Sequence, residues 1–102
     1  MIQSKLIPID WLPVGIPHGY ANGYVGLPPA HPWFDMDYNA IPAEVHGGLT
    51  YGEDHFPRMQ PDGLYWIGFD TCHSGDDSIS CNQEYCEHEL EKLCKQAEEA
   101  ML

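Results

Sequence analysis

Two polar, glycine-containing segments hold most of the residues that could do chemistry. They are residues 45–51 (VHGGLTY) and residues 66–77 (WIGFDTCHSGDD). Imidazole and carboxylate groups supply acid–base, metal-binding or hydrogen-bonding chemistry. Glycine lets the backbone approach a neighbour or a ligand closely, because it has no Cβ atom. We therefore look for a site in these two segments, and we expect them to be neighbours in space.

The first segment places two glycines directly after His46. Within a strand, each glycine costs about 0.5–1 kcal/mol relative to alanine, and such a cost marks a bulge or a close approach. One interpretation of Gly47 and Gly48 is a pair of backbone amides presented to a ligand oxygen. The other is a bulge that only bends the sheet. The sequence leaves both open.

In the second segment, Asp70, His73 and Asp76 recur at every third residue. In a tight turn the three side chains could converge, and His46 could join them on a divalent metal. The alternative is an Asx turn at Asp70 and a helix lead-in that begins at Asp76. The spacing matches no specific metal motif. We predict no resident metal; if one is bound, its ligands should be His46, Asp70, His73 and Asp76.

The cysteines offer a weaker set of hypotheses. A second metal set would combine Cys72, His73, Cys81 and Cys86, but the paired C-x₂-C pattern of structural zinc sites is absent. Nucleophilic catalysis by Cys72 or Ser74 beside His73 has no nucleophile-elbow pattern to support it. In a reducing cytosol free thiols are expected. We predict no catalytic residue, and the question of an enzyme stays open, with a binding protein favoured.

Aromatic side chains and one arginine complete the candidate site. Trp33 lies in a proline-flanked aromatic loop, where it could stack on a flat ligand such as a nucleobase. Arg58 could neutralise a phosphate or carboxylate, or pair with Glu53 or Asp54. We expect Trp11 and Trp66 to be core residues. The predicted ligand-binding residues are His46, Gly47, Gly48, Asp70, His73, Asp76, Trp33 and Arg58.

The elements that must position these residues are short strands and one helix. Prolines in residues 1–18 exclude a helix and predict an extended arm or edge segment that packs Trp11 on the body. Residues 19–27 predict a strand, or a turn at Asn22-Gly23 followed by a strand. Residues 43–51 predict a second strand interrupted by its glycines, residues 52–63 a loop, and residues 64–69 the clearest strand. Residues 70–81 predict a polar loop.

Residues 82–102 predict a helix. Asn82 is a suitable N-cap, and Glu84 in the first turn suits the helix dipole. Apolar residues follow the helical period on one face: Cys86, Leu90, Leu93, Cys94, Ala97 and Met101. The fold class is therefore α+β. We expect a single domain over residues 1–102, in which three or four antiparallel strands with long Pro/Gly-rich loops are covered by this helix.

The charge is strongly acidic, with 4 basic residues against 16 acidic ones and a net charge of −12. No basic patch is present, so ordinary binding to the nucleic-acid backbone is not expected. No stretch approaches the roughly 20 apolar residues of a membrane helix, and the first residues lack the layout of a signal peptide. We expect a cytosolic protein that could form oligomers.

Several motifs resemble a family of small proteins encoded by bacteriophages and prophages. The resemblance covers roughly residues 20–77, and the motifs that carry it stand in this order: GYVGLP (23–28), His31-Pro32, VHGGLTY (45–51), WIGFD (66–70) and HSGD (73–76). It implies a phage accessory protein in the cytoplasm of a bacterial host, without an assigned activity. By analogy, such proteins look like antagonists of host defence.

Three functions follow as hypotheses. The first is sequestration of a small nucleotide-type signalling molecule in a pocket between the HGG segment and the FDTCHSGD loop, formed in part by an oligomer interface. The second is a metal-dependent hydrolase that uses the same histidines and aspartates. The third is an acidic protein that blocks a host defence factor or mimics nucleic acid through a glutamate-rich helix face: Glu84, Glu87, Glu91 and Glu98. We favour the first.

Overall fold

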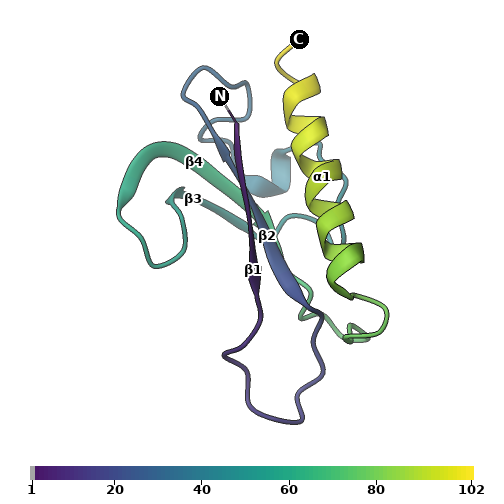
Figure 1. The fold of residues 1–102 in the computed structure, drawn as a ribbon. Coiled ribbons are helices and arrows are strands. Elements are labelled where there is room, and N and C mark those ends of the chain that lie inside the picture. Colours follow the sequence, from purple (N-terminus) through teal and green to yellow (C-terminus); the bar gives the residue numbers. More distant parts are fainter. Residues whose placement is uncertain (1) are drawn as a thin grey trace.

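The computed structural model describes residues 2–102 and confirms the α+β fold class. Figure 1 shows a sheet with one C-terminal helix lying across it. The strands are β1 (Gln3–Pro8), β2 (Ala21–Leu27), β3 (Tyr51–His55) and β4 (Pro61–Phe69). A short 3₁₀ helix, η1 (Tyr38–Ala40), lies in the long loop between β2 and β3, and α1 (Gln83–Glu99) ends the fold. The strand order is β1-β2-β4-β3, with every neighbouring pair antiparallel.

The helix α1 begins where the sequence predicts. The side chain of Asn82 accepts a hydrogen bond from the Tyr85 N–H at 2.9 Å, which satisfies one of the free donors of the first turn. Cys86, Leu93 and Ala97 are buried against the sheet, which confirms the predicted apolar face at these positions. Met101 lies beyond the end of the helix and is 45% exposed.

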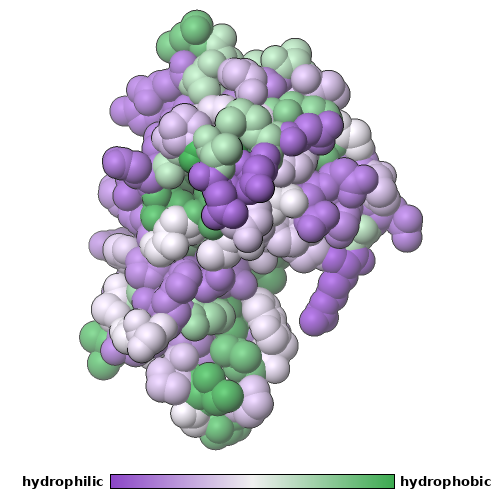
Figure 2. Space-filling model, turned by 180° about the vertical axis from the view of Figure 1, so that it is seen from behind, coloured by the Kyte–Doolittle hydropathy of each residue, from purple (hydrophilic) through white to green (hydrophobic). Residues whose placement is uncertain are grey.

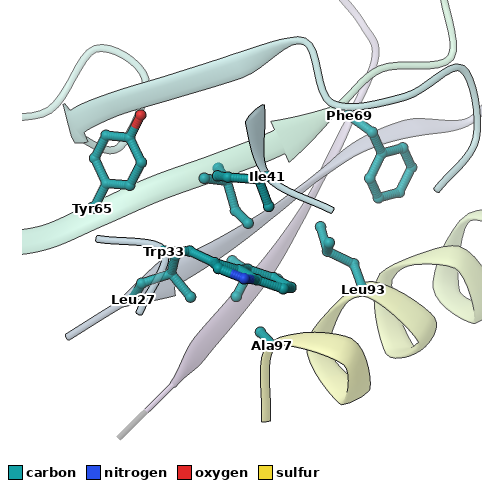
Figure 3. Close-up of a cluster of buried hydrophobic side chains, with 9 residues drawn as sticks. Leu27, Trp33, Ile41, Tyr65, Phe69, Leu93 and Ala97 are labelled. Carbon is teal, nitrogen blue, oxygen red and sulfur yellow. The ribbon is translucent and has the colours of Figure 1, made fainter. Parts of the chain in front are cut away.

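One face of the sheet carries the main hydrophobic core. Figure 3 shows the long β2–β3 loop and α1 covering this face together. Trp33 and Ile41 from the loop pack with Leu93 and Ala97 from the helix over the strands. A hydrogen bond between His31 Nε2 and the carbonyl oxygen of Ala97, 2.7 Å long, ties the loop to the helix. The other members of this core are Val25, Leu27, Tyr65, Ile67 and Phe69.

The opposite face of the sheet carries a second set of aromatic side chains. Trp66 is fully buried there, as expected, and its ring lies 5.0 Å from that of Phe56 between centroids. Tyr24 packs edge-on against Phe56 at 5.2 Å. The ammonium group of Lys5, on the edge strand β1, lies 4.7 Å from the Phe56 centroid, a cation–π contact that covers this layer.

Three expectations about local structure are wrong. Residues 43–50 do not form a strand: Gly48 N–H donates to the Val45 carbonyl at 2.8 Å, so the two glycines make a turn with φ of 68° and 78°. The loop predicted at residues 52–63 is strand at both ends, because β3 runs from Tyr51 to His55 and β4 begins at Pro61 instead of Leu64. Trp11 is not a core residue but is 47% exposed, and its loop leaves the sheet after β1 (Figure 1).

No helix within residues 2–102 is long and apolar enough to span a membrane.

Candidate functional site

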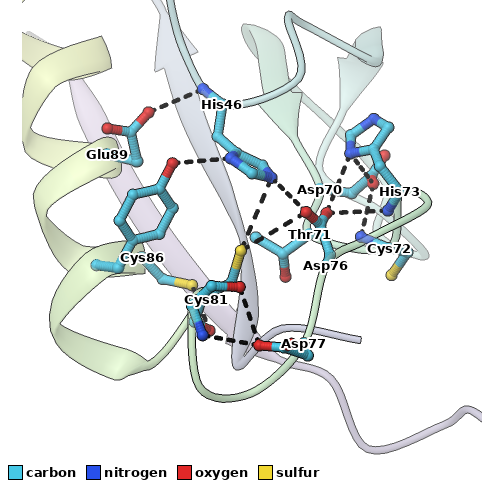
Figure 4. Close-up of polar contacts among 12 residues, drawn as sticks. His46, Asp70, Thr71, Cys72, His73, Asp76, Asp77, Cys81, Cys86 and Glu89 are labelled. Atoms are coloured by element: carbon cyan, nitrogen blue, oxygen red, sulfur yellow. Dashed lines mark hydrogen bonds and ion pairs between the residues drawn. The ribbon is translucent and has the colours of Figure 1, made fainter. Parts of the chain in front are cut away.

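The pairing of β3 with β4 brings the two polar segments together. Tyr51 at the start of β3 is paired with Gly68 near the end of β4, and the Thr50 N–H donates to the Gly68 carbonyl at 2.9 Å. Because the strands are antiparallel, the residues before β3 and those after β4 lie at the same end of the sheet. His46 therefore faces the loop of residues 70–76, as Figure 4 shows.

His46 is held through three polar contacts, one from the loop after β4 and two from α1. Its Nε2 lies 2.9 Å from Asp76 Oδ1, and its Nδ1 lies 2.8 Å from the Tyr85 hydroxyl on α1. Its backbone N–H donates to Oε1 of Glu89, also on α1, at 2.8 Å. Both ring nitrogens and the backbone are thus fixed, so the orientation of this imidazole is set by the fold.

Asp76 is the centre of this network. One carboxylate oxygen contacts His46, and the other accepts from the His73 N–H at 3.0 Å and lies 3.3 Å from His73 Nδ1. Burial raises the pKa of the Asp76 carboxyl, but these hydrogen bonds from His46 and His73 outweigh it and hold the pKa below its usual range. Asp70 contributes from the outer side, with Oδ1 3.4 Å from His73 Nδ1. Asp76 is therefore an anchored, ionised carboxylate.

The glycines do not leave an open backbone surface at this corner. The His73 ring covers Gly47 so closely that a Cβ atom there would lie 2.4 Å from Cε1 of the imidazole. Gly48 has open space around it, but its N–H is used by the turn. The glycines thus serve a tight turn and a close contact inside the protein, and the bulge interpretation does not apply because residues 45–48 are not in a strand.

Cys81, Tyr85 and Glu89 complete this end of the sheet. Tyr85 and Glu89 are in none of the predicted sites, and Cys81 is only in the cysteine-based metal set. The Cys81 Sγ atom is buried, 3.8 Å from His46 Nε2 and 3.7 Å from Asp76 Oδ1. Burial and the Asp76 charge raise the pKa of this thiol. The sequence does indicate that Glu89 is buried, because the helical period places it on the same face of α1 as Cys86 and Leu93. We define the His–Asp–Cys corner as His46, Asp76 and Cys81.

This geometry does not suit a nucleophilic triad. In such a triad one ring nitrogen of the histidine takes the proton of the nucleophile, while the carboxylate holds the N–H of the other ring nitrogen and stabilises the imidazolium. Here Cys81 and Asp76 both face Nε2, and Nδ1 belongs to Tyr85. The donor atoms of His46, Asp76 and Cys81 lie within 4.8 Å of one another, which is the spacing of a set of metal ligands.

Trp33 and Arg58, which the sequence groups with these residues, lie elsewhere. Trp33 is 6% exposed and is part of the main core, so its ring has no free face for a ligand. Arg58 is exposed in the turn between β3 and β4, on the face of the sheet opposite α1. The structure therefore brings His46, Gly47, Asp70, His73 and Asp76 together and separates Trp33 and Arg58 from them.

Arg58 lines the aromatic pocket, a cavity of about 460 Å³ on the face opposite α1. Trp11, Tyr24 and Phe56 supply aromatic walls, and Asp10 adds a carboxylate. The remaining lining residues are Ile7, Pro8 and Pro57. Figure 2 shows hydrophobic side chains gathered at the lower end of the molecule, where the β1–β2 loop lies. Val14 and Ile16, which follow Trp11 in the same loop, are exposed.

The glutamate-rich face of α1 points to solvent. Glu84, Glu87, Glu91 and Glu98 are all exposed. A shallower groove of about 700 Å³ runs between α1 and the edge strand β1, and Leu6, Leu90 and Cys94 form its floor. Glu87, Glu91 and Glu98 line the same groove, so it presents a mixed apolar and acidic surface.

No family model, curated protein or solved structure matches this chain. The resemblance to small phage proteins therefore stays a prediction from the sequence motifs.

Proposed function

We propose that the protein binds a small, flat, anionic molecule of the nucleotide class in the aromatic pocket and sequesters it without reacting with it. The observation that carries this proposal is the gathering of Arg58 with the rings of Trp11, Tyr24 and Phe56 around one cavity. Aromatic rings are suitable surfaces for stacking a base, and a guanidinium group matches the geometry of a phosphate. The aromatic pocket offers both within the volume typical of small-molecule sites.

The pocket walls are held in place before any ligand arrives. Phe56 is packed between Tyr24 and Trp66, with centroid distances of 5.2 and 5.0 Å. Lys5 covers the same cluster through its contact with the Phe56 ring. Rigid walls reduce the ordering cost of binding. Trp11 is the half-exposed wall, and stacking on a base would cover it.

Arg58 is the group that would select an anionic ligand. The protein carries a net charge of −12, so its general field repels anions. Attraction must come from a local cation, and Arg58 is held in the left-handed backbone region with φ of 65°. That conformation costs about 1–2 kcal/mol for a residue other than glycine. Backbone strain of this kind is concentrated at functional positions.

The ligand belongs in the aromatic pocket rather than in the corner where the sequence suggested it. At the corner, His46, Asp76 and His73 bind one another, and the His73 ring covers Gly47. Among residues 2–102, no buried side-chain nitrogen or oxygen lacks a hydrogen-bond partner. A ligand there would have to replace contacts that already exist, whereas the pocket around Arg58 offers free aromatic surface.

The biological role follows from the resemblance. A phage accessory protein that holds a nucleotide-type immune signal would antagonise host defence in the bacterial cytoplasm by lowering the free concentration of that signal. Tight binding without turnover would suffice. Two alternatives can be distinguished from sequestration by experiment. A metal-dependent hydrolase would turn its substrate over, and an acidic blocker would form a complex with a host protein.

The test is a binding screen of the full chain against cyclic nucleotides, linear dinucleotides and ADP-ribose derivatives, by thermal shift and then by calorimetry. We expect at least one compound to raise the melting temperature and to quench the fluorescence of Trp11. Arg58→Asn removes the charge but tolerates the left-handed backbone, and Trp11→Ala removes the stacking surface. Each should weaken binding by at least about tenfold.

Met59→Ala is the matched control, because Met59 is the next residue in the same turn and is 60% exposed without lining the pocket. It should bind the same compound with unchanged affinity. The proposal fails if no compound stabilises the wild-type protein, or if Arg58→Asn and Trp11→Ala bind as tightly as Met59→Ala.

A further inference from the structure

We propose that the His–Asp–Cys corner is a binding site for a zinc-class transition metal, with His46 Nε2, Asp76 Oδ1 and Cys81 Sγ as its ligands. The site lies at the end of the sheet covered by α1 and is separate from the aromatic pocket. It differs from both metal sets suggested by the sequence, because it joins a histidine and an aspartate from one set to a cysteine from the other.

The separations of the three donor atoms fit one tetrahedral ion. Zinc binds nitrogen and carboxylate oxygen at about 2.0–2.2 Å and thiolate sulfur at about 2.3 Å, which puts tetrahedral ligands about 3.3–3.6 Å apart. In the structure, Nε2 and Oδ1 are 2.9 Å apart, Sγ and Nε2 3.8 Å, and Sγ and Oδ1 3.7 Å. Shifts of a few tenths of an ångström would therefore place all three on one ion.

The surrounding contacts already orient each ligand. A metal-bound histidine almost always gives its second ring N–H to an oxygen, and Tyr85 places its hydroxyl 2.8 Å from Nδ1 of His46. Because a tyrosine hydroxyl can donate or accept, this contact survives when Nε2 exchanges its proton for a metal. The second oxygen of Asp76 is held by the His73 N–H at 3.0 Å.

The Cys81 backbone is fixed on both sides as well. Its N–H donates to the Asp77 carbonyl at 2.9 Å, and its carbonyl accepts from the Tyr20 N–H at 2.7 Å. The side chain is thus directed into the corner by a turn that is tied to β2. Asp76 and Cys81 both lie on the loop between β4 and α1, and these hydrogen bonds hold that loop in the fixed geometry that a precise site requires.

The chemistry of the donors selects the metal. Thiolate and imidazole ligands favour zinc and its neighbours over magnesium or calcium, which prefer oxygen alone. A carboxylate and a thiolate together carry two negative charges, which one divalent ion neutralises. On binding, the ion replaces the proton of the Cys81 thiol, which passes to solvent. The His46 ring stays neutral, because it carries its proton on Nδ1 instead of Nε2 when Nε2 binds the ion.

Three protein ligands leave one coordination position for water or for a ligand atom. His73 does not fill it through its Nδ1, because that atom contacts the other oxygen of Asp76, at 3.3 Å. The His46 side chain is 19% exposed, and a shallow pocket of about 460 Å³ borders it with Tyr85, Glu89 and Lys92. His46 is thus the most exposed of the three ligands, since Asp76 and Cys81 are buried.

The test uses cobalt(II) as a spectroscopic substitute for zinc, with protein purified without a histidine tag. We expect wild-type protein to bind one equivalent of cobalt with a thiolate-to-cobalt charge-transfer band and with visible absorption of tetrahedral intensity. Zinc should displace it. Cys81→Ser should lose the charge-transfer band and should bind at least about tenfold more weakly. Cys94→Ser, which removes a half-buried thiol on α1, should keep both.

Tyr85→Phe supplies a second measurement that does not depend on the folding of Cys81→Ser. It keeps all three ligands, so the charge-transfer band should remain, whereas the affinity should fall about 10–100-fold because Nδ1 loses its partner. Trp11→Ala should bind metal like the wild type, which separates this site from the aromatic pocket. The inference is overturned if wild-type protein shows no thiolate band, or if Tyr85→Phe and Cys81→Ser bind cobalt like Cys94→Ser.

Discussion

Gly47 and the imidazole ring of His73 are in contact so close that no side chain fits between them. A Cβ atom at position 47 would lie 2.4 Å from Cε1 of His73, whereas a Cβ atom at Gly48 would meet nothing within 4 Å. Both glycines have positive φ, 68° and 78°. The two positions therefore share the same backbone demand and differ only in the space around them, which makes them a matched pair.

Gly48→Ala should cost only the strain of the left-handed conformation, about 1–2 kcal/mol. Gly47→Ala should cost more, because the His73 ring must also give up its contacts with Asp76, which adds about 0.5–1.5 kcal/mol. Chemical denaturation of both variants measures the difference. In a His73→Ala background the extra cost of Gly47→Ala should disappear. Equal costs for the two alanines in the wild-type background would contradict the contact.

The charge of Asp76 should make the stability of the protein depend on pH. Its pKa is lower in the folded protein than its ordinary value, because the hydrogen bonds from His46 and His73 outweigh burial. A carboxyl of this kind adds stability above its unfolded pKa of about 3.9, and that stability is lost as the pH falls through the lower folded pKa. Asp76→Asn should remove this contribution.

The measurement is the free energy of unfolding of both proteins from about pH 6 down to about pH 3. At the upper end Asp76→Asn should be less stable than the wild type by about 1–3 kcal/mol, and the difference should shrink as the pH falls below about 4. Asp10→Asn, at an exposed position of the β1–β2 loop, should run parallel to the wild type. A constant difference at every pH would show that the Asp76 charge is not what stabilises the corner.

Glu89 should matter for stability, whereas the exposed glutamates of α1 should not. It is 5% exposed, and its Oε1 accepts the His46 N–H while its Oε2 lies 3.2 Å from Lys92 Nζ. Glu89→Ala would leave a partly buried N–H without an acceptor, at a cost of about 1–3 kcal/mol. Glu89→Gln keeps a carbonyl oxygen and should lose less. Thermal unfolding compares both with Glu91→Ala, an exposed change that we expect to stay within about 0.5 kcal/mol.

The sequence predicted the parts of the fold that depend on local pattern. The N-cap at Asn82, the buried face of α1 and the aromatic strand before Asp70 need only short-range information. The strand predicted across Gly47 and Gly48 was wrong, because two left-handed residues make a turn. The polar edge strand β3 (YGEDH) lacks the hydrophobic alternation by which strands are recognised.

Some features of the candidate site could also be predicted from the sequence, and others could not. The proximity of His46 to Asp76 could be predicted, since both flank strands that pair at the same end of the sheet. We expected Trp11 in the core and Trp33 at the ligand, and the structure has Trp33 buried and Trp11 exposed. The sequence could not predict this, because the burial of both residues depends on where their loops lie. The approach of Tyr85 to His46 depends on how α1 lies across the sheet, which no local pattern determines.

Two residues other than glycine have left-handed backbone conformations, and they allow us to test whether this strain is linked to ligand binding. Arg58 has φ of 65° and Asp35 has φ of 62°. Replacing either with glycine should relieve the strain and raise the stability by about 1 kcal/mol, since the rest of the backbone needs no change. For a domain of this size that corresponds to a rise in melting temperature of about 4–8 °C.

The two variants should differ in ligand binding. Arg58→Gly removes the cation of the aromatic pocket and should lose the nucleotide-type ligand, whereas Asp35→Gly lies in the β2–β3 loop and should bind normally. Melting curves with and without ligand measure both effects in one experiment. If the strain at position 58 has no function, Arg58→Gly should raise the stability without weakening ligand binding. That outcome would exclude Arg58 from the binding site.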